Sequence, residues 1–259
     1  MIELADILAF LSGTAVGLVL ALIGGGGSIL ATPALLYVVG VSNPHMAIGT
    51  SALAVSVNAF ANLITHARRG NVKWRCAMLF GGAGVAGAAA GAALGKVTSA
   101  DILLPLFAVL MIVIGALMLR PRKNEGDSNV RLSRENAPKL IAYGLGAGAL
   151  SGFFGIGGGF LIVPGLISAT GMTMLQAVGS SLFSVGSFGA TTAASYAIDG
   201  LVDWRIAGLF IFGGVIGGVI GASLAEYLAK QRGMLQRVFA GVVFAVAGYM
   251  LYRTLLTPH

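Results

Sequence analysis

The sequence predicts an all-α polytopic membrane protein, and three observations support this fold class. Hydrophobic residues make up 57% of the 259 positions and charged residues only 10%, whereas soluble domains carry about 25% charged residues. The apolar residues form long runs, such as 102–119 and 207–225, that contain no Asp, Glu, Lys or Arg. The chain also has 40 glycines, which weaken soluble helices but allow membrane helices to pack closely.

The apolar segments are expected to be helices, and their lengths indicate which of them can cross a bilayer. A membrane-spanning helix needs about 20 apolar residues, with about 17 as a lower bound. The expected segments are 5–23, 28–41, 47–65, 76–95, 102–119, 140–154, 160–175, 177–198, 206–225 and 236–253. The first two segments of each half are expected to be too short for comfortable full spans.

The stretch 120–139 is the only long polar part of the sequence. It combines Pro121, Gly126 and Pro138 with charges of both signs, a composition typical of a solvated connector. We therefore expect a first transmembrane repeat at 1–119, a cytoplasmic linker at 120–139 and a second transmembrane repeat at 140–259.

The two halves on either side of this linker are related in sequence. At an offset of 130 residues Trp74 corresponds to Trp204, each followed by Arg, and at an offset of 131 Pro33 corresponds to Pro164. A match of both tryptophans is hard to attribute to chance, and internal duplication is frequent in transporters.

The relative orientation of the repeats depends on where Lys and Arg lie. With about five segments per half and an outside N-terminus, most basic residues fall on the inner side, as the positive-inside rule requires. Four segments per half and an inside N-terminus satisfy the rule almost as well, so a parallel repeat stays open. The expected fold is two inverted repeats of about five membrane segments each, with Gly-broken half-helices at the start of each repeat.

Two glycine tracts are the most specific motifs. Residues 24–28 are Gly-Gly-Gly-Gly-Ser and residues 155–159 are Gly-Ile-Gly-Gly-Gly, each followed by one of the matched prolines. Consecutive glycines break a helix, and the freed backbone groups must face protein or a watery cavity. Half-helices starting at Ser28 and Phe160 would direct N–H donors there, and helix N-termini bind anions.

Two other interpretations of the tracts were weighed. A dinucleotide-binding motif is rejected because no βαβ pattern surrounds the glycines. A packing kink without a ligand would be the better interpretation of a single tract. The presence of two matched tracts favours a binding site.

A polar helix face is the second candidate. Thr50, Asn58, Asn62 and His66 recur at multiples of four residues, so they share one face of segment 47–65. Hydroxyl and amide groups can bind an anion, but they also join membrane helices, and for Ser and Thr the two roles are equally well supported. Buried Asn is costlier, so binding is favoured there. His66 could carry protons, although an interfacial role is the stronger expectation.

The complete set of expected substrate-binding residues combines the tracts with the polar faces of both halves. They are Gly25, Gly26, Gly27, Ser28, Thr50, Ser51, Asn58, Asn62, Gly157, Gly158, Gly159, Phe160, Ser180, Ser181 and Thr192. No catalytic residue, metal site or cofactor is expected, because no His, Cys, Asp or Glu cluster lies within the spans.

These motifs together resemble the TauE/SafE sulfite exporter family. The resemblance rests on the paired tracts, on Ala-Ile-Gly-Thr-Ser (47–51) with Ala-Val-Gly-Ser-Ser (177–181), and on Gly-x-Val-x-Trp-Arg at 70–75 and 200–205. It implies transport of sulfite, sulfonates or related anions, mostly outward. The tracts differ in their spacing to the following proline, six steps from Gly27 and five from Gly159, so the half-sites are not strictly equivalent.

The expected function is an alternating-access carrier that exports a small anion, with a passive anion channel lined by the same glycines as the alternative. A membrane enzyme is weakly supported. The expected partners are the anion and the lipid bilayer of a bacterial inner membrane, with a homodimer left open. Nucleic acid is not expected, because the basic residues lie in short loops between apolar runs.

Overall fold

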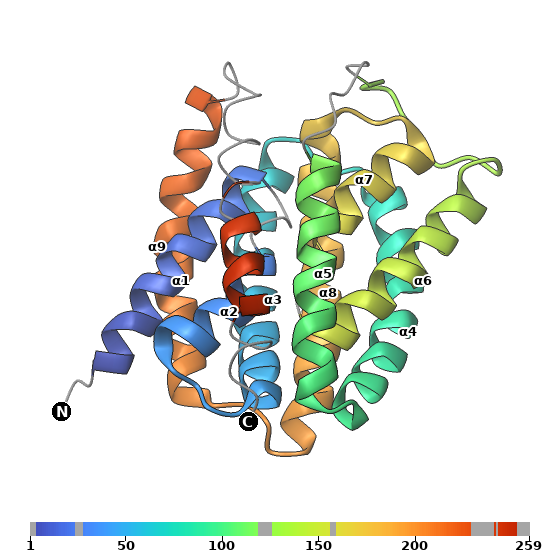
Figure 1. The fold of residues 1–259 in the computed structure, drawn as a ribbon. Helices are drawn as coiled ribbons and strands as arrows, with labels where there is room; N and C mark the ends of the chain where they lie inside the picture. The colour runs from blue at the N-terminus through green and yellow to red at the C-terminus, as the bar shows by residue number, and fades with distance from the viewer. Residues whose placement is uncertain are drawn as a thin grey trace.

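The computed structural model of the chain is a bundle of helices (Figure 1). The long helices run between two opposite faces of this bundle. The structure describes residues 4–23, 28–118, 126–155, 159–228, 241 and 243–252. Among these residues, four helical stretches are long and apolar enough to cross a membrane: Leu4–Leu22, Pro44–Arg68, Trp74–Val97 and Trp204–Gly221. The expectation of an all-α polytopic membrane protein is confirmed.

The helices follow the order of the expected apolar segments. They are α1 (Leu4–Ile23), α2 (Ala31–Pro33), η2 (Ala34–Val39), α3 (Pro44–Arg68), α4 (Trp74–Val97), α5 (Ala100–Met118), α6 (Ala137–Phe154), α7 (Gly159–Thr170), α8 (Met174–Ile198) and α9 (Trp204–Leu228). A further helical stretch is Val243–Tyr252. The described chain contains no strand, only one isolated bridge between Asp127 and Met172.

Local capping explains why the central helix is longer than its apolar run. The Asn43 side chain accepts hydrogen bonds from the backbone N–H groups of His45, at 2.9 Å, and Met46, at 3.3 Å. Pro44 occupies the first helical position, where its missing N–H costs nothing. α3 therefore begins at Pro44, before the apolar run itself starts.

The short segments that follow the glycine tracts turn back toward the face from which the chain came. Ser28–Val39, which includes α2 and the π-helical η2, returns to the face where α1 begins, and α7 returns to the face where α6 begins (Figure 1). α7 has 12 residues, which span about 18 Å, far less than a bilayer core of about 30 Å.

One expectation about these segments is wrong. α1 has 20 residues, enough to span the hydrocarbon core. Its first turn contains Asp6, whose carboxylate accepts a 2.6 Å hydrogen bond from Arg205. The charge is neutralised there, so α1 is long enough to cross the membrane, unlike the Ser28–Val39 segment after the first tract.

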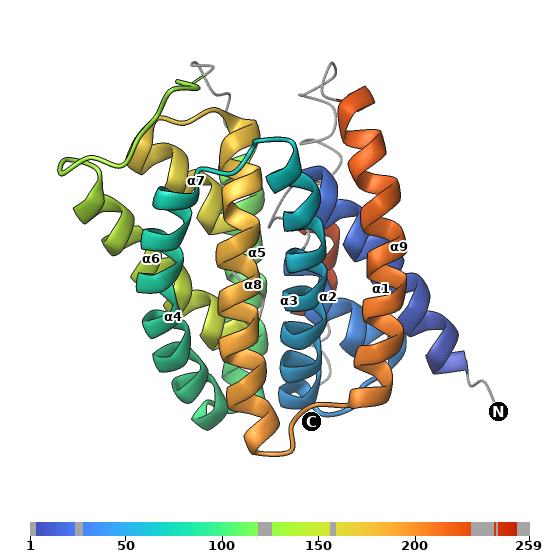
Figure 2. The ribbon, with the colours of Figure 1, turned by 180° about the vertical axis from the view of Figure 1, so that it is seen from behind.

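The closest helix packing joins the two halves of the sequence rather than each half to itself. α1 packs on α9, and α6 packs on α4, while α3 and α8 cross at the centre (Figures 1 and 2). Helices α1, η2, α3 and α9 contact one another and form what we call the first bundle. Helices α4, α6, α7 and α8 form the second bundle.

Glycines allow the backbones of these paired helices to touch. A Cβ atom added at Gly17 of α1 would overlap the backbone of Gly214 in α9, and one added at Gly148 of α6 would overlap the backbone of Gly84 in α4. The two contacts involve residues that correspond at the offsets found in the sequence. Glycines that recur every four residues in α4 and α9 meet the backbones of α6 and α1 in the same way, so they form close-packing faces: Gly87, Gly91 and Gly95 in α4, and Gly213, Gly217 and Gly221 in α9.

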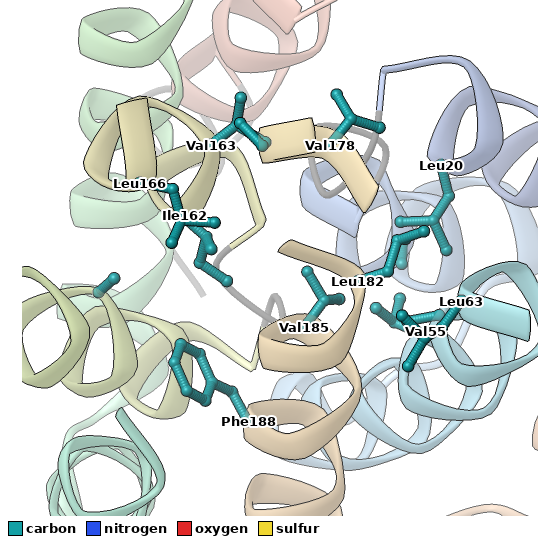
Figure 3. Packing of buried hydrophobic residues seen from close by; sticks show 14 of the residues in the cluster. Leu20, Val55, Leu63, Ile162, Val163, Leu166, Val178, Leu182, Val185 and Phe188 are labelled. Carbon is teal, nitrogen blue, oxygen red and sulfur yellow. The ribbon is translucent and has the colours of Figure 1, made fainter. Parts of the chain in front are cut away.

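The central crossing joins α3 and α8, which run in opposite directions (Figures 1 and 2). The Oγ atom of Ser56 donates a 2.7 Å hydrogen bond to the backbone oxygen of Gly186, which corresponds to Ser56 at the offset of 130. Figure 3 shows Leu182 of α8 beside Val55 of α3, with the α7 residues Ile162 and Val163 on the other side of α8.

Candidate functional site

Ser51 of α3 contacts residues that lie beside both glycine tracts. Its Oγ atom lies 2.8 Å from Oγ1 of Thr32 in α2, and either atom can be the donor. It also lies 3.0 Å from the backbone oxygen of Ile48 and 3.5 Å from that of Gly155, the residue that ends α6. The last distance is at the outer limit for a hydrogen bond. Ser51 therefore connects α2, which follows the first glycine tract, with Gly155, the first residue of the second tract.

Gly155 shows how the second tract approaches the opposite half. Its φ is 67°, in the left-handed region that favours glycine. An added Cβ would also overlap the side chain of Ile48 in α3. Only glycine satisfies both requirements at this position, so the tract begins in direct contact with α3.

The predicted residues of the tracts are covered only in part. Ser28 is fully buried and Gly159 is the first residue of α7. The tract residues that lie outside the described part of the chain are Gly25, Gly26, Gly27, Gly157 and Gly158, together with the side chain of Phe160.

Thr50 and Ser180, predicted as site residues, each hold the start of another helix. Oγ1 of Thr50 accepts a 2.9 Å hydrogen bond from the backbone N–H of Asp203, just before α9. Oγ of Ser180 accepts a bond of the same length from the backbone N–H of Lys73, just before α4. These hydroxyl groups therefore have a structural partner, which leaves a remaining lone pair and proton for other contacts.

Asn58 is the most unusual residue of the polar face. Its side chain is 1% exposed, and neither its Nδ2 nor its Oδ1 atom has a hydrogen-bond partner among the described residues. It packs on α9, where a Cβ at Gly214 would overlap its amide. Leaving a buried polar group unpaired costs about 1–3 kcal/mol, so the Asn58 amide is a candidate to bind a water molecule or a substrate.

Asn62, one turn further, differs from Asn58. Its Nδ2 atom donates a 3.0 Å hydrogen bond to the backbone oxygen of Asn58, and it faces Gly218 of α9. His66 is 8% exposed, and its Nδ1 atom has no partner in the described part of the chain. The face predicted from the spacing is thus buried along its length.

The matching face of α8 has a different chemical character. Phe188 stands where α3 has Asn58 and packs on Gly84 as Asn58 packs on Gly214. Thr192 stands where α3 has Asn62, and its buried hydroxyl has no partner among the described residues. Ser181 donates within its own helix, to the Val178 oxygen at 2.8 Å. The polar face is therefore asymmetric between the halves.

Sequence reasoning missed two polar residues that the structure adds. Thr32 contacts Ser51. The one sign of this contact in the sequence was that Thr32 directly precedes the matched Pro33. Ser151 of α6 is fully buried with an unpaired hydroxyl within the described chain. A lone serine among glycines and alanines gives no periodic pattern. The two halves gave no signal either, because the residue of α1 that corresponds to Ser151 is Leu20.

The two faces of the bundle differ in charge. The end of α3, the start of α4, the 126–136 segment and the start of α6 lie at one face (Figure 1). The described basic residues in these parts of the chain are Arg68, Arg69, Lys73, Arg75, Arg131, Arg134 and Lys139. At the opposite face the described basic residues are Lys96 and Arg205, and each is paired with a carboxylate at 2.6 Å. No group of three or more His, Cys, Asp or Glu residues that could hold a metal occurs in the described chain.

The described helices and their buried neutral polar groups are those of a helical membrane protein, and the proteins that this chain resembles are membrane transporters. The chain belongs to the family described as Sulfite exporter TauE/SafE, which matches residues 9–250.

Relatives from distant organisms cover nearly the whole chain. A probable membrane transporter protein of Xylella fastidiosa (strain Temecula1 / ATCC 700964) is 51% identical over 248 residues, which is 94% of each chain. The probable membrane transporter protein YdhB of Bacillus subtilis (strain 168) is 26% identical over 91% of this chain and 95% of its own length. The probable membrane transporter protein YfcA of Escherichia coli (strain K12) is 25% identical over 92% of this chain and 85% of its own length. No solved structure matches the chain.

Proposed function

We propose that this protein is an alternating-access carrier that exports a small anion, sulfite or an organosulfonate, across a bacterial inner membrane. The observation that carries the proposal is the junction at Ser51, where α2 of the first half and the start of the second glycine tract contact one helix, α3. Such a junction of broken helices is where transporters bind their substrates.

The chemistry of the nearby groups favours an anion. The buried side chains of Ser51, Asn58 and Thr192 are neutral and can donate hydrogen bonds. A carboxylate at this depth would repel an anion and attract a cation. The proposed binding set is the one predicted from the sequence, extended by Thr32 and Ser151.

We propose that the two bundles move as rigid units. These units differ from the two inverted halves of the sequence. The first and second bundles each contain helices from both halves, and α3 and α8 form their main contact. The chain passes between the bundles through 69–73 and 199–203, at opposite faces (Figure 2). Gly70 and Gly200 each have a φ of 71° in these loops. Rocking of the bundles about the α3–α8 crossing would expose the centre to each face in turn.

The proposed orientation follows from charge. The excess of basic residues at the face of the 126–136 segment supports a cytoplasmic location for that face under the positive-inside rule. The start of α1 lies at the other face (Figure 1), so it would be periplasmic.

The test is flux in proteoliposomes that contain the purified protein. Labelled sulfite, sulfoacetate, taurine and sulfate are compared for saturation and for acceleration by unlabelled anion on the opposite side. Saturable, trans-stimulated flux of sulfite or sulfoacetate supports the carrier. Flux that rises linearly with concentration, without trans-stimulation, indicates a channel instead. Flux of sulfate alone overturns the assigned substrate class, and flux of taurine alone, a sulfonate whose ammonium group leaves it without net charge, overturns the assignment to an anion.

A matched pair of variants tests the junction. Ser51→Ala removes the hydroxyl that contacts Thr32 and Gly155. Ser187→Ala removes a hydroxyl that bonds only to the backbone of its own helix, at Phe183. We expect Ser51→Ala to lower the apparent affinity about tenfold, the effect of one lost hydrogen bond to a charged group, and Ser187→Ala to leave it unchanged. Equal effects of both substitutions would exclude Ser51 from the site.

A further inference from the structure

A hollow of about 420 Å³ lies between the start of α4 and the segment 126–136. Its charged lining residues are Lys73, Arg75 and Arg131, and none of the described residues that line it is acidic. The volume is within the range of small-ligand sites, about 300–1,000 Å³. Three positive side chains around one hollow favour an anionic occupant.

The positive charges of this hollow are largely uncompensated within the described chain. Lys73 donates from Nζ to the backbone oxygen of Ser128 at 2.7 Å, which joins the two walls of the hollow. Arg75 and Arg131 are exposed, and neither forms an ion pair with a residue that the structure describes. Their guanidinium groups are therefore available for a phosphate, which arginine binds in a bidentate manner.

An apolar stripe runs from the rim of the hollow along the outer face of α4. Trp74 is 45% exposed, and its ring is held against Phe183 with centroids 6.3 Å apart. Met78 and Val85, four and eleven residues further on, are also exposed and lie on the same face at helical spacing. Exposed tryptophan at the end of a membrane helix is typical of the lipid–water interface.

We propose that this hollow binds the phosphate of an anionic phospholipid, whose acyl chains lie along the Trp74–Met78–Val85 stripe. A basic hollow alone would fit any small anion, but the adjoining apolar stripe fits an amphiphile. Basic pockets beside membrane helices are suited to anionic headgroups. The proposal depends on the chain spanning a bilayer and not on which anion it transports.

The matched position at the opposite face lacks these features. Asp203 stands where the hollow has Lys73, and its Oδ1 atom accepts a 3.0 Å hydrogen bond from the backbone of Ile206. Arg205, which corresponds to Arg75, is paired with Asp6 at 2.6 Å. The lipid site is therefore expected in one leaflet only, on the side of the 126–136 segment.

The test is lipid binding to the purified full-length protein, measured by native mass spectrometry during titration with phosphatidylglycerol or phosphatidylcholine. The double variant Arg75→Gln/Arg131→Gln removes two of the three charges that line the hollow. Arg68→Gln/Arg134→Gln changes the net charge equally at the same face but outside the hollow. Size-exclusion profiles and melting temperatures establish that both variants are folded. If the double hollow variant does not fold, the single variant Arg131→Gln, in an exposed segment, replaces it in the titration.

We expect wild type to bind phosphatidylglycerol in preference to phosphatidylcholine. The hollow variant should lose phosphatidylglycerol affinity by about tenfold or more, since each basic residue near an anionic headgroup contributes substantially, and the control variant should change less than about twofold on the same scale. Equal losses in both variants, or no loss in the hollow variant, would overturn the proposal. Displacement of the lipid by millimolar inorganic phosphate would assign the hollow to a soluble anion instead.

Discussion

The hydroxyl group of Thr50 accepts a 2.9 Å hydrogen bond from the backbone N–H of Asp203, 153 residues further along the chain. The bond attaches the start of α9 to α3, inside the first bundle. Ser180 makes the matching bond to Lys73 and attaches the start of α4 to α8, inside the second bundle. Each bundle is therefore fastened at the point where the chain enters it.

Replacing Thr50 with Val should destabilise the protein, because the shape is kept but the Asp203 N–H loses its acceptor. The expected loss is about 1 kcal/mol, because an unpaired buried donor costs about 1–3 kcal/mol and the Asp203 N–H is only part-buried. Thr191→Val is the matched control, since the Thr191 hydroxyl bonds only within α8, to Ser187. Thermal unfolding in detergent measures both variants, and equal melting temperatures for the two would show that the Thr50 bond contributes nothing.

Two glycines of α6 should respond in opposite ways to the addition of one methyl group. In Gly148→Ala the new Cβ would overlap the backbone of Gly84, whereas at Gly146 no atom lies within 4 Å of the added Cβ. Overpacking costs about 1–3 kcal/mol, so Gly148→Ala should unfold at a lower temperature. Gly146→Ala should be neutral or slightly stabilising, by up to about 1 kcal/mol from helix propensity. A Gly148→Ala protein as stable as wild type would contradict the packing seen between α4 and α6.

Asn58→Leu should separate substrate binding from stability. The substitution removes two buried polar atoms that have no described partner, so the melting temperature should stay the same or rise. If Asn58 donates to the anion, affinity for sulfite should fall about tenfold or more. Asn62→Leu should have a smaller effect on affinity, because the Asn62 amide already donates to the Asn58 backbone.

Binding of sulfite to purified protein, measured by isothermal titration calorimetry, gives the affinities for this pair. A stable Asn58→Leu protein with wild-type affinity would mean that Asn58 lies outside the binding site.

The orientation can be tested with single cysteines in a Cys76→Ala background. Cys76 is buried, and its removal leaves a chain without thiols. A cysteine at Asn129, in the 126–136 segment, should resist an impermeant maleimide added to intact cells and react after permeabilisation. A cysteine at Ser99, which is exposed at the opposite face between α4 and α5, should react in intact cells. The reverse labelling pattern would invert the proposed orientation.

The helical segments could be predicted from the sequence, because they depend on local patterns. The offset that pairs Trp74 with Trp204 also pairs Thr50 with Ser180, and the structure gives both hydroxyls equivalent partners. The glycine spacing in α4 indicated a close contact but could not identify α6 as the partner, because any small-residue face accepts any other.

The candidate site was harder to predict for a related reason. Helical spacing placed Asn58 and Asn62 on one face, but only the packing on Gly214 and Gly218 shows where that face points. The asymmetry with Phe188 was visible in the sequence at the same offset, yet its meaning depends on burial, which spacing alone does not determine.

The packing of α1 against α9 has a consequence for biosynthesis, because α1 is made long before its partner helix. About 180 residues separate the end of α1 from the start of α9, and ribosomes add about 5–20 residues per second. α1 therefore waits about 10–40 s at these rates before the helix that covers Gly13 and Gly17 has been synthesised. Throughout that interval its glycine face must be shielded by lipid or by the insertion machinery. A nascent chain that stops before Trp204 would leave α1 without its main packing partner, and quality-control proteases should recognise it.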